Sequence, residues 1–141
     1  MAIYANPLGK RSKGIQYKIA SSGSFDIAAA IADGAAPDDD HEVFEVPAGA
    51  VITDVHVIPT TTVDGTTPTI NVDLQDLGGG NPVALAAGVS PSARSSTAVT
   101  AARTTAPKIV TVNSTAADST VGVGSVEVEY YVDGRSNENE G

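Results

Sequence analysis

The sequence predicts an all-β fold, an antiparallel β-sandwich or jelly roll of about seven to nine short strands with an extended N-terminal arm. Valine, alanine, threonine and serine are abundant among the 141 residues, and this composition favours sheets over helices. Apolar and polar residues alternate with a period of two in several short runs. Turn signals separate these runs at intervals of about eight to fifteen residues, whereas a parallel sheet would need helices between its strands.

The length fits a single domain with flanking segments. Residues 1–14 hold Asn-Pro, two glycines and three cations without sustained periodicity, so they are interpreted as an extended arm. Residues 15–133 are expected to form one β-sandwich domain. The polar segment 134–141 is expected to be a flexible tail.

The first half of the domain contains alternating runs and one acidic loop. Residues 15–19 predict a strand, which the sequence SSGS at 21–24 is expected to end. In residues 25–31, FDIAAAI, every second residue is apolar, which favours a strand, although the alanines leave a short helix open. Residues 33–42 are predicted to be a loop, and residues 43–46 a short strand.

Residues 51–58 follow a Pro-Ala-Gly corner and predict a central strand, because both of its faces carry bulky side chains. The first face holds valines and a threonine. The second face is a candidate subunit interface and consists of Ile52, Asp54, His56 and Ile58.

The second half contains further strand patterns. Asp64-Gly65 is expected to tip a hairpin leading into a strand at 69–76, whose Gln75 is expected to face outward. Weaker patterns near 83–86 and 97–102 predict short strands, and the second could instead contact a partner. Clearer strands are predicted at 108–113 and 126–133, with Val126, Val128, Tyr130 and Val132 inward and a β-bulge at Gly122 or Gly124.

Charge and cysteine content exclude several classes of function. A net charge of −9 argues against general nucleic-acid binding, which depends on neutralising phosphates. The absence of cysteine excludes disulfides, thiolate metal sites and cysteine nucleophiles. No secretion signal or membrane-spanning run is present, so we expect synthesis in a host cytoplasm, without export by a standard signal and without membrane insertion.

The charges are unevenly distributed along the chain. Lys10, Arg11, Lys13 and Lys18 precede the first acidic residue, and residues 26–45 then carry seven carboxylates and no cation. A basic end joined to an acidic body suits docking on a partner or a neighbouring subunit, although an ordinary solvated tail has the same pattern.

Residues that could carry chemistry lack companions in the sequence. His56 is one of two histidines, whereas a zinc or iron site needs about three converging ligands, so no metal, cofactor or catalytic residue is expected. The run DDDH at 38–41 does not follow the spacing of an EF-hand and is interpreted as a solvated acidic loop, with an ion left open. Glu127 and Glu129 lie two apart on one strand face, unlike the two acids of a glycosidase cleft.

Two segments resemble proteins of tailed-bacteriophage heads. FEVPAGAVITDVHVIPTTTVDGTTPTINVDL (44–74) and VGSVEVEYYVDG (123–134) are similar to the Val-Pro-Ala-Gly corner, valine-rich strands and Asp-Gly turn of small head decoration, or cement, proteins. The resemblance implies jelly-roll subunits, usually homotrimers, that bind the major capsid protein outside the capsid and stabilise its lattice. We expect residues 1–14 to make the capsid contact, with Lys10, Arg11 and Lys13 as charge anchors.

Two other classes remain open at the level of sequence. A phage tail, baseplate or head-fibre module could use the same fold and bind carbohydrate, but four Tyr and two Phe give few rings to stack on sugars. A hydrolase is disfavoured, because GVGSV at 122–126 is not a nucleophile elbow followed by a helix.

Overall fold

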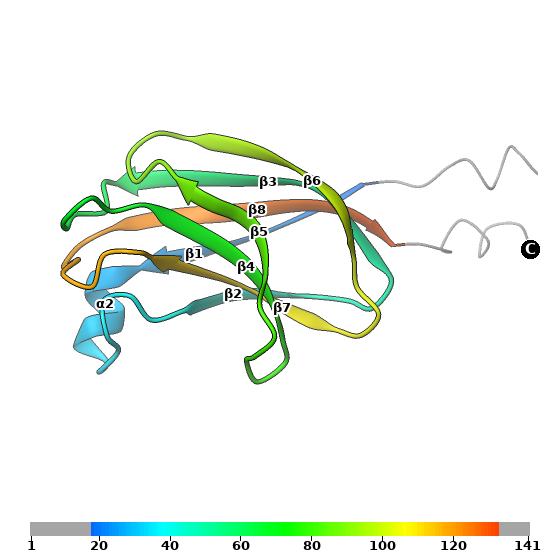
Figure 1. Ribbon diagram of the computed structural model, residues 1–141, viewed down its shortest axis with the longest axis horizontal. Coiled ribbons are helices and arrows are strands. Elements are labelled where there is room, and N and C mark those ends of the chain that lie inside the picture. Colours follow the sequence, from blue (N-terminus) through cyan, green and yellow to red (C-terminus); the bar gives the residue numbers. More distant parts are fainter. Residues whose placement is uncertain (1–17, 133–141) are drawn as a thin grey trace, which may run out of the picture.

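The chain folds into a sandwich of two four-stranded antiparallel sheets (Figure 1). The computed structural model describes residues 18–132, and within this range it has eight strands and one short helix. The predicted fold class is therefore confirmed, while the predicted arm and tail lie outside the described residues. The elements are β1 (Ile19–Asp26), α2 (Ile27–Ala32), β2 (His41–Val46), β3 (Ala50–Thr61), β4 (Ile70–Asp76), β5 (Val83–Val89), β6 (Ser95–Arg103), β7 (Lys108–Ser114) and β8 (Val123–Val132).

The strand order is that of a jelly roll. One sheet has the order β1-β8-β3-β6 and the other β2-β7-β4-β5. Only the β4–β5 connection stays within one sheet, and every other connection in the described chain crosses between the sheets. The chain thus wraps around its own core, and the predicted β3–β4 hairpin at Asp64-Gly65 is wrong because these strands belong to different sheets.

The core lies between the sheets and is built mainly from valine. Alternate residues of the strands point inward, as a period of two requires. At most 2% of each of the following large side chains is exposed: Ile27, Ile52, Ile70, Val46, Val55, Val57, Val63, Val72, Val110, Val112, Val126 and Val128. The predicted inward face of 126–130 is confirmed, because Tyr130 is also buried.

The start of the domain differs from its prediction. Strand β1 continues through the SSGS segment, and pairs with β8 along its whole length. The following apolar residues form α2 instead of a strand. Asp26 Oδ1 accepts a hydrogen bond from the Ala29 N–H at 3.0 Å and caps this helix, so the alanine content and the cap outweigh the alternating pattern.

Glycines in β8 and directly before it make room for core side chains. Gly122 and Gly124 lie on the inward side, as Val126 does, so inward and outward residues alternate without a break along β8. The predicted bulge in this strand is therefore wrong. The irregularity lies opposite, in β3, between Pro59 and Thr61. A Cβ at Gly124 would lie 2.8 Å from the Phe25 ring, which explains the need for glycine here.

The Pro-Ala-Gly corner carries the chain from β2 in one sheet to β3 in the other. Beside it runs the β6–β7 connection, which also crosses between the sheets (Figure 1). The buried hydroxyl of Thr104 joins them, because its Oγ1 accepts from the Ala50 N–H at 2.9 Å and donates to the Pro47 carbonyl at 2.7 Å. This hydroxyl ties the two crossovers together with two backbone hydrogen bonds, from the Gly49 N–H to the Thr104 carbonyl at 2.8 Å and from the Thr104 N–H to the Ala50 carbonyl at 2.9 Å.

The loops at 62–69 and 115–122 are joined by two aspartates. Asp64 accepts from the Thr120 hydroxyl, the Val121 N–H and the Thr120 N–H, and these bonds lower the pKa of Asp64 to about 2. In the reverse direction Asp118 accepts from the N–H and the hydroxyl of Thr66, which lowers the pKa of Asp118. The Asp-Gly segment is therefore an anchored crossover loop.

Candidate functional site

The outer face of the β1-β8-β3-β6 sheet holds the largest set of predicted site residues. One row of directly paired residues crosses all four strands on this face: Ser22, Glu127, His56 and Ser96. The inward neighbours of this row, such as Val55 and Val128, fill the core. The polar side chains consequently point away from the core and form a continuous strip.

The predicted interface set is only partly correct. A bulge between Ile52 and Asp54 shifts the register of β3 against both of its neighbours. It reverses which side chains face inward, so Ile52 is 1% exposed in the core and does not share a face with His56. The outer set reduces to Asp54, His56 and Ile58, and its role in subunit contact stays a prediction.

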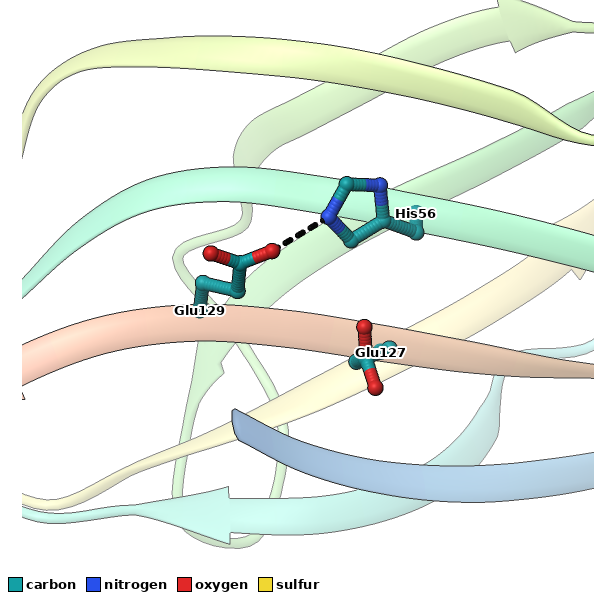
Figure 2. A group of neighbouring side chains, drawn as sticks. All are labelled: His56, Glu127 and Glu129. Atoms are coloured by element: carbon teal, nitrogen blue, oxygen red, sulfur yellow. Dashed lines mark hydrogen bonds and ion pairs between the residues drawn. The ribbon is translucent and has the colours of Figure 1, made fainter. Parts of the chain in front are cut away.

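His56 is held from both sides by side chains of neighbouring strands. Its Nδ1 lies 2.7 Å from the Ser96 hydroxyl on β6, and its Nε2 lies 2.6 Å from Glu129 Oε2 on β8. Figure 2 shows the imidazole reaching from β3 to Glu129, with Glu127 on the same side of the sheet. The predicted isolation of His56 is therefore wrong, since antiparallel pairing brings two carboxylates beside it.

Negative charge is concentrated around this histidine. Asp54 and Glu129 are direct cross-strand partners, an arrangement that is unfavourable for two carboxylates without a neighbouring cation. The Lys18 ammonium lies 3.4 Å from Asp54 Oδ2 and 3.8 Å from Glu129 Oε1. Lys18, which is about half exposed, offsets part of the repulsion.

The contacts also follow the order of a Ser-His-acid triad, from Ser96 through His56 to Glu129. Acyl transfer additionally needs N–H donors aimed at the developing oxyanion. Strand N–H groups lie in the plane of a sheet, whereas these side chains stand out of its face. The row therefore lacks the donor geometry that makes such a triad catalytic.

The acidic run at 38–41 lies on the other sheet and is not simply a solvated loop. Asp40 accepts from the Gln75 amide at 2.8 Å and from the Asn113 amide at 2.9 Å, so it folds over β4 and β7. Gln75 lies on the outer face of β4, as predicted, but Asp40 and its neighbours cover it, so it is buried at 6% exposure. Desolvation, followed by the charge of Asp40, raises the pKa of the neighbouring Asp73.

Comparison with solved structures relates this sandwich to phage capsids. A chain of the cyanophage Pam1 capsid asymmetric unit is 25% identical to this chain, with a TM-score of 0.53, over 94% of this chain and 92% of that one. A chain of the acidic stable capsid of Helicobacter pylori bacteriophage KHP30 is 13% identical (TM-score 0.49, 84% and 94% covered). A chain of the capsid of Ralstonia phage GP4 is 17% identical (TM-score 0.46, 84% and 85% covered). The TM-scores of the KHP30 and GP4 chains are too low to support an argument about this chain.

The Pam1 likeness extends over nearly the full length of both chains, so it concerns the whole sandwich. The Pam1 neighbour is a chain of a phage capsid, which supports a structural role in a virion and the predicted resemblance to phage head proteins. No family model matches the chain, and no curated protein matches it significantly.

The predicted capsid anchors Lys10, Arg11 and Lys13 lie outside the described residues. Residues 18–132 carry four basic and fourteen acidic side chains, so the described body is strongly acidic. Within this part of the chain, no helix has the length and hydrophobicity to cross a membrane.

Proposed function

We propose that this chain is a decoration, or cement, protein that binds the outer surface of a tailed-phage head and stabilises its lattice. The observation that carries the proposal is the whole-length likeness to a chain of the Pam1 capsid asymmetric unit, at 25% identity and a TM-score of 0.53. The jelly-roll order of the eight described strands agrees with it. In this function the chain acts by association and catalyses no reaction.

Charge supplies the proposed mode of attachment. The arm has three cations, Lys10, Arg11 and Lys13, whereas residues 18–132 are strongly acidic. We assign the arm to an acidic groove of the major capsid protein, where it orders on binding and adds contact area. Capsid symmetry repeats this weak contact many times, which strengthens the overall attachment.

Subunit contact is the second part of the proposal. Asp54, His56 and Ile58 stand on the outer face of β3, a central strand of its sheet, where a second copy could cover them. We assign this face to contact within a homotrimer seated on the capsid exterior. The polar composition of the face suits an assembly that forms from soluble subunits.

The attachment can be tested by adding back the purified chain to heads that lack it. The full chain is expected to cosediment with the heads, and a chain without residues 1–13 is expected to remain in the supernatant. A combined Lys10→Ala, Arg11→Ala, Lys13→Ala variant is expected to lose most occupancy at physiological salt. Arg94→Ala, which removes an exposed cation of the body, is the matched control and is expected to bind normally.

Two results would contradict the proposal. Unchanged occupancy of the shortened chain would show that the arm is not the anchor, even if the chain binds heads. Failure of the full chain to bind heads would reject the decoration function itself.

A further inference from the structure

Three side chains of metal-binding type converge on the outer face of the β1-β8-β3-β6 sheet. They are His56, Glu127 and Glu129, named here the His56 cluster, and one potential ligand atom of each lies within 4.8 Å of the others (Figure 2). We propose that the His56 cluster binds one divalent first-row transition-metal ion, for which Zn²⁺ is the representative probe. This site does not depend on attachment of the arm to capsids, and it shares His56 with the face assigned to subunit contact.

The backbone already holds the ligands at suitable positions. His56 and Glu127 are direct partners on two strands that are both internal to the sheet, and Glu129 is the diagonal neighbour. Zinc binds imidazole nitrogen and carboxylate oxygen at about 2.0–2.2 Å, so ligand atoms around it lie about 3.4 Å apart. Rotation of the glutamate side chains closes the spacing from 4.8 Å without movement of the strands.

The Ser96 hydroxyl fixes the orientation of the imidazole. It lies 2.7 Å from Nδ1, so an Nδ1–H donated to Ser96 Oγ leaves the Nε2 lone pair directed at Glu129 Oε2. An outer hydrogen bond of this kind is a regular feature of histidine ligands. Metal binding replaces the hydrogen bond between Nε2 and Glu129 Oε2, and a proton that bridges these atoms is released to solvent.

The donor set selects the class of ion. Calcium and magnesium prefer oxygen ligands alone, whereas one imidazole with two carboxylates suits zinc and its first-row neighbours. The two glutamates balance the charge of a divalent ion, and solvent water fills the open coordination position. Lys18, 3.8 Å from Glu129 Oε1, is a competing cation that metal binding must displace.

Titration of the full-length, chelator-treated chain with ZnCl₂ in a calorimeter tests the site. We expect saturable binding of one ion per chain, and Co²⁺ is expected to produce a visible absorption band upon binding. His56→Ala, Glu127→Gln and Glu129→Gln are each expected to weaken binding at least about 10-fold. Lys18→Met is expected to strengthen binding several-fold, because it removes the competing charge.

Glu45→Gln is the matched control, since Glu45 is exposed on β2 in the other sheet, and it is expected to bind like the parent chain. Circular dichroism checks the fold of each variant, and the near-isosteric Glu127→Gln remains informative if His56→Ala unfolds. Absence of saturable binding overturns the proposal. Equal affinity in the parent and in a folded Glu127→Gln variant also overturns it, because the ion would then bind elsewhere.

Discussion

Replacement of Thr104 by valine tests how the two sheets are joined at the Pro-Ala-Gly corner. Valine has nearly the shape of threonine, so the substitution removes the hydroxyl without opening a cavity. The Ala50 N–H then loses its acceptor at 2.9 Å inside a fully buried residue. The Pro47 carbonyl loses its donor at 2.7 Å, although Pro47 itself is exposed and its carbonyl can accept from water.

The expected cost follows from these two losses. A buried donor left without a partner costs about 1–3 kcal/mol, and the bond to the more accessible carbonyl contributes about 0.5–1.5 kcal/mol. Thr104→Val is therefore expected to lower the free energy of unfolding by about 1.5–4.5 kcal/mol. Thr104→Ser keeps the hydroxyl and loses one methyl group, for about 1 kcal/mol.

Urea denaturation followed by far-ultraviolet circular dichroism measures both variants. We expect the midpoint of Thr104→Val to fall clearly below that of Thr104→Ser, with similar denaturant slopes. If Thr104→Ser were as destabilised as Thr104→Val, the hydroxyl would not be what ties the β2–β3 and β6–β7 crossovers together.

Three further predictions concern the acidic groups and the core. The pKa of Asp64 falls from 3.8 to about 2 on folding, so its contribution to stability is present above pH 3.8 and is lost as the pH falls toward 2. Asp64→Asn is expected to flatten the pH dependence of the melting temperature between these two values, and an unchanged pH profile would refute this. Burial raises the pKa of Asp73, so its ionised form opposes folding. Asp73→Asn is therefore expected to raise the melting temperature at pH 7, and the gain is expected to vanish below the pKa that Asp73 has in the unfolded chain. A lower melting temperature of the variant at pH 7 would contradict this. Phe25→Ala is expected to lower the free energy of unfolding by about 3–5 kcal/mol. Gly124→Ala is expected to lower it less in the Phe25→Ala background than in the parent chain, because the ring that a Cβ would meet at 2.8 Å is then absent. Strictly additive losses in denaturation would argue against this contact.

Alternation along the sequence was enough to predict the sandwich and the positions of its later strands. The inward face of 126–130 follows directly from a period of two, because one face of each strand must reach the core. The same rule failed in β3, where the bulge after Ile52 changes parity without any glycine or proline to signal it. It failed again at α2, where a local cap by Asp26 decides the structure.

The His56 cluster could be predicted only in part. Glu127 and Glu129 share a face because they are two residues apart, and His56 is the histidine that the sequence places in a predicted strand. Their meeting depends on which residue of β8 pairs with which residue of β3, and this register is set by packing of the whole sandwich. Neither run of sequence carries that information alone.

Copy number in purified heads tests the central claim most directly. Quantitative mass spectrometry of gradient-purified, tail-free heads, from the phage that encodes this chain, gives its ratio to the major capsid protein. The decoration function predicts many copies per head, in fixed proportion to the shell subunit, as binding at repeated lattice positions requires. Absence of the chain from heads, or only a few copies per particle, would contradict it.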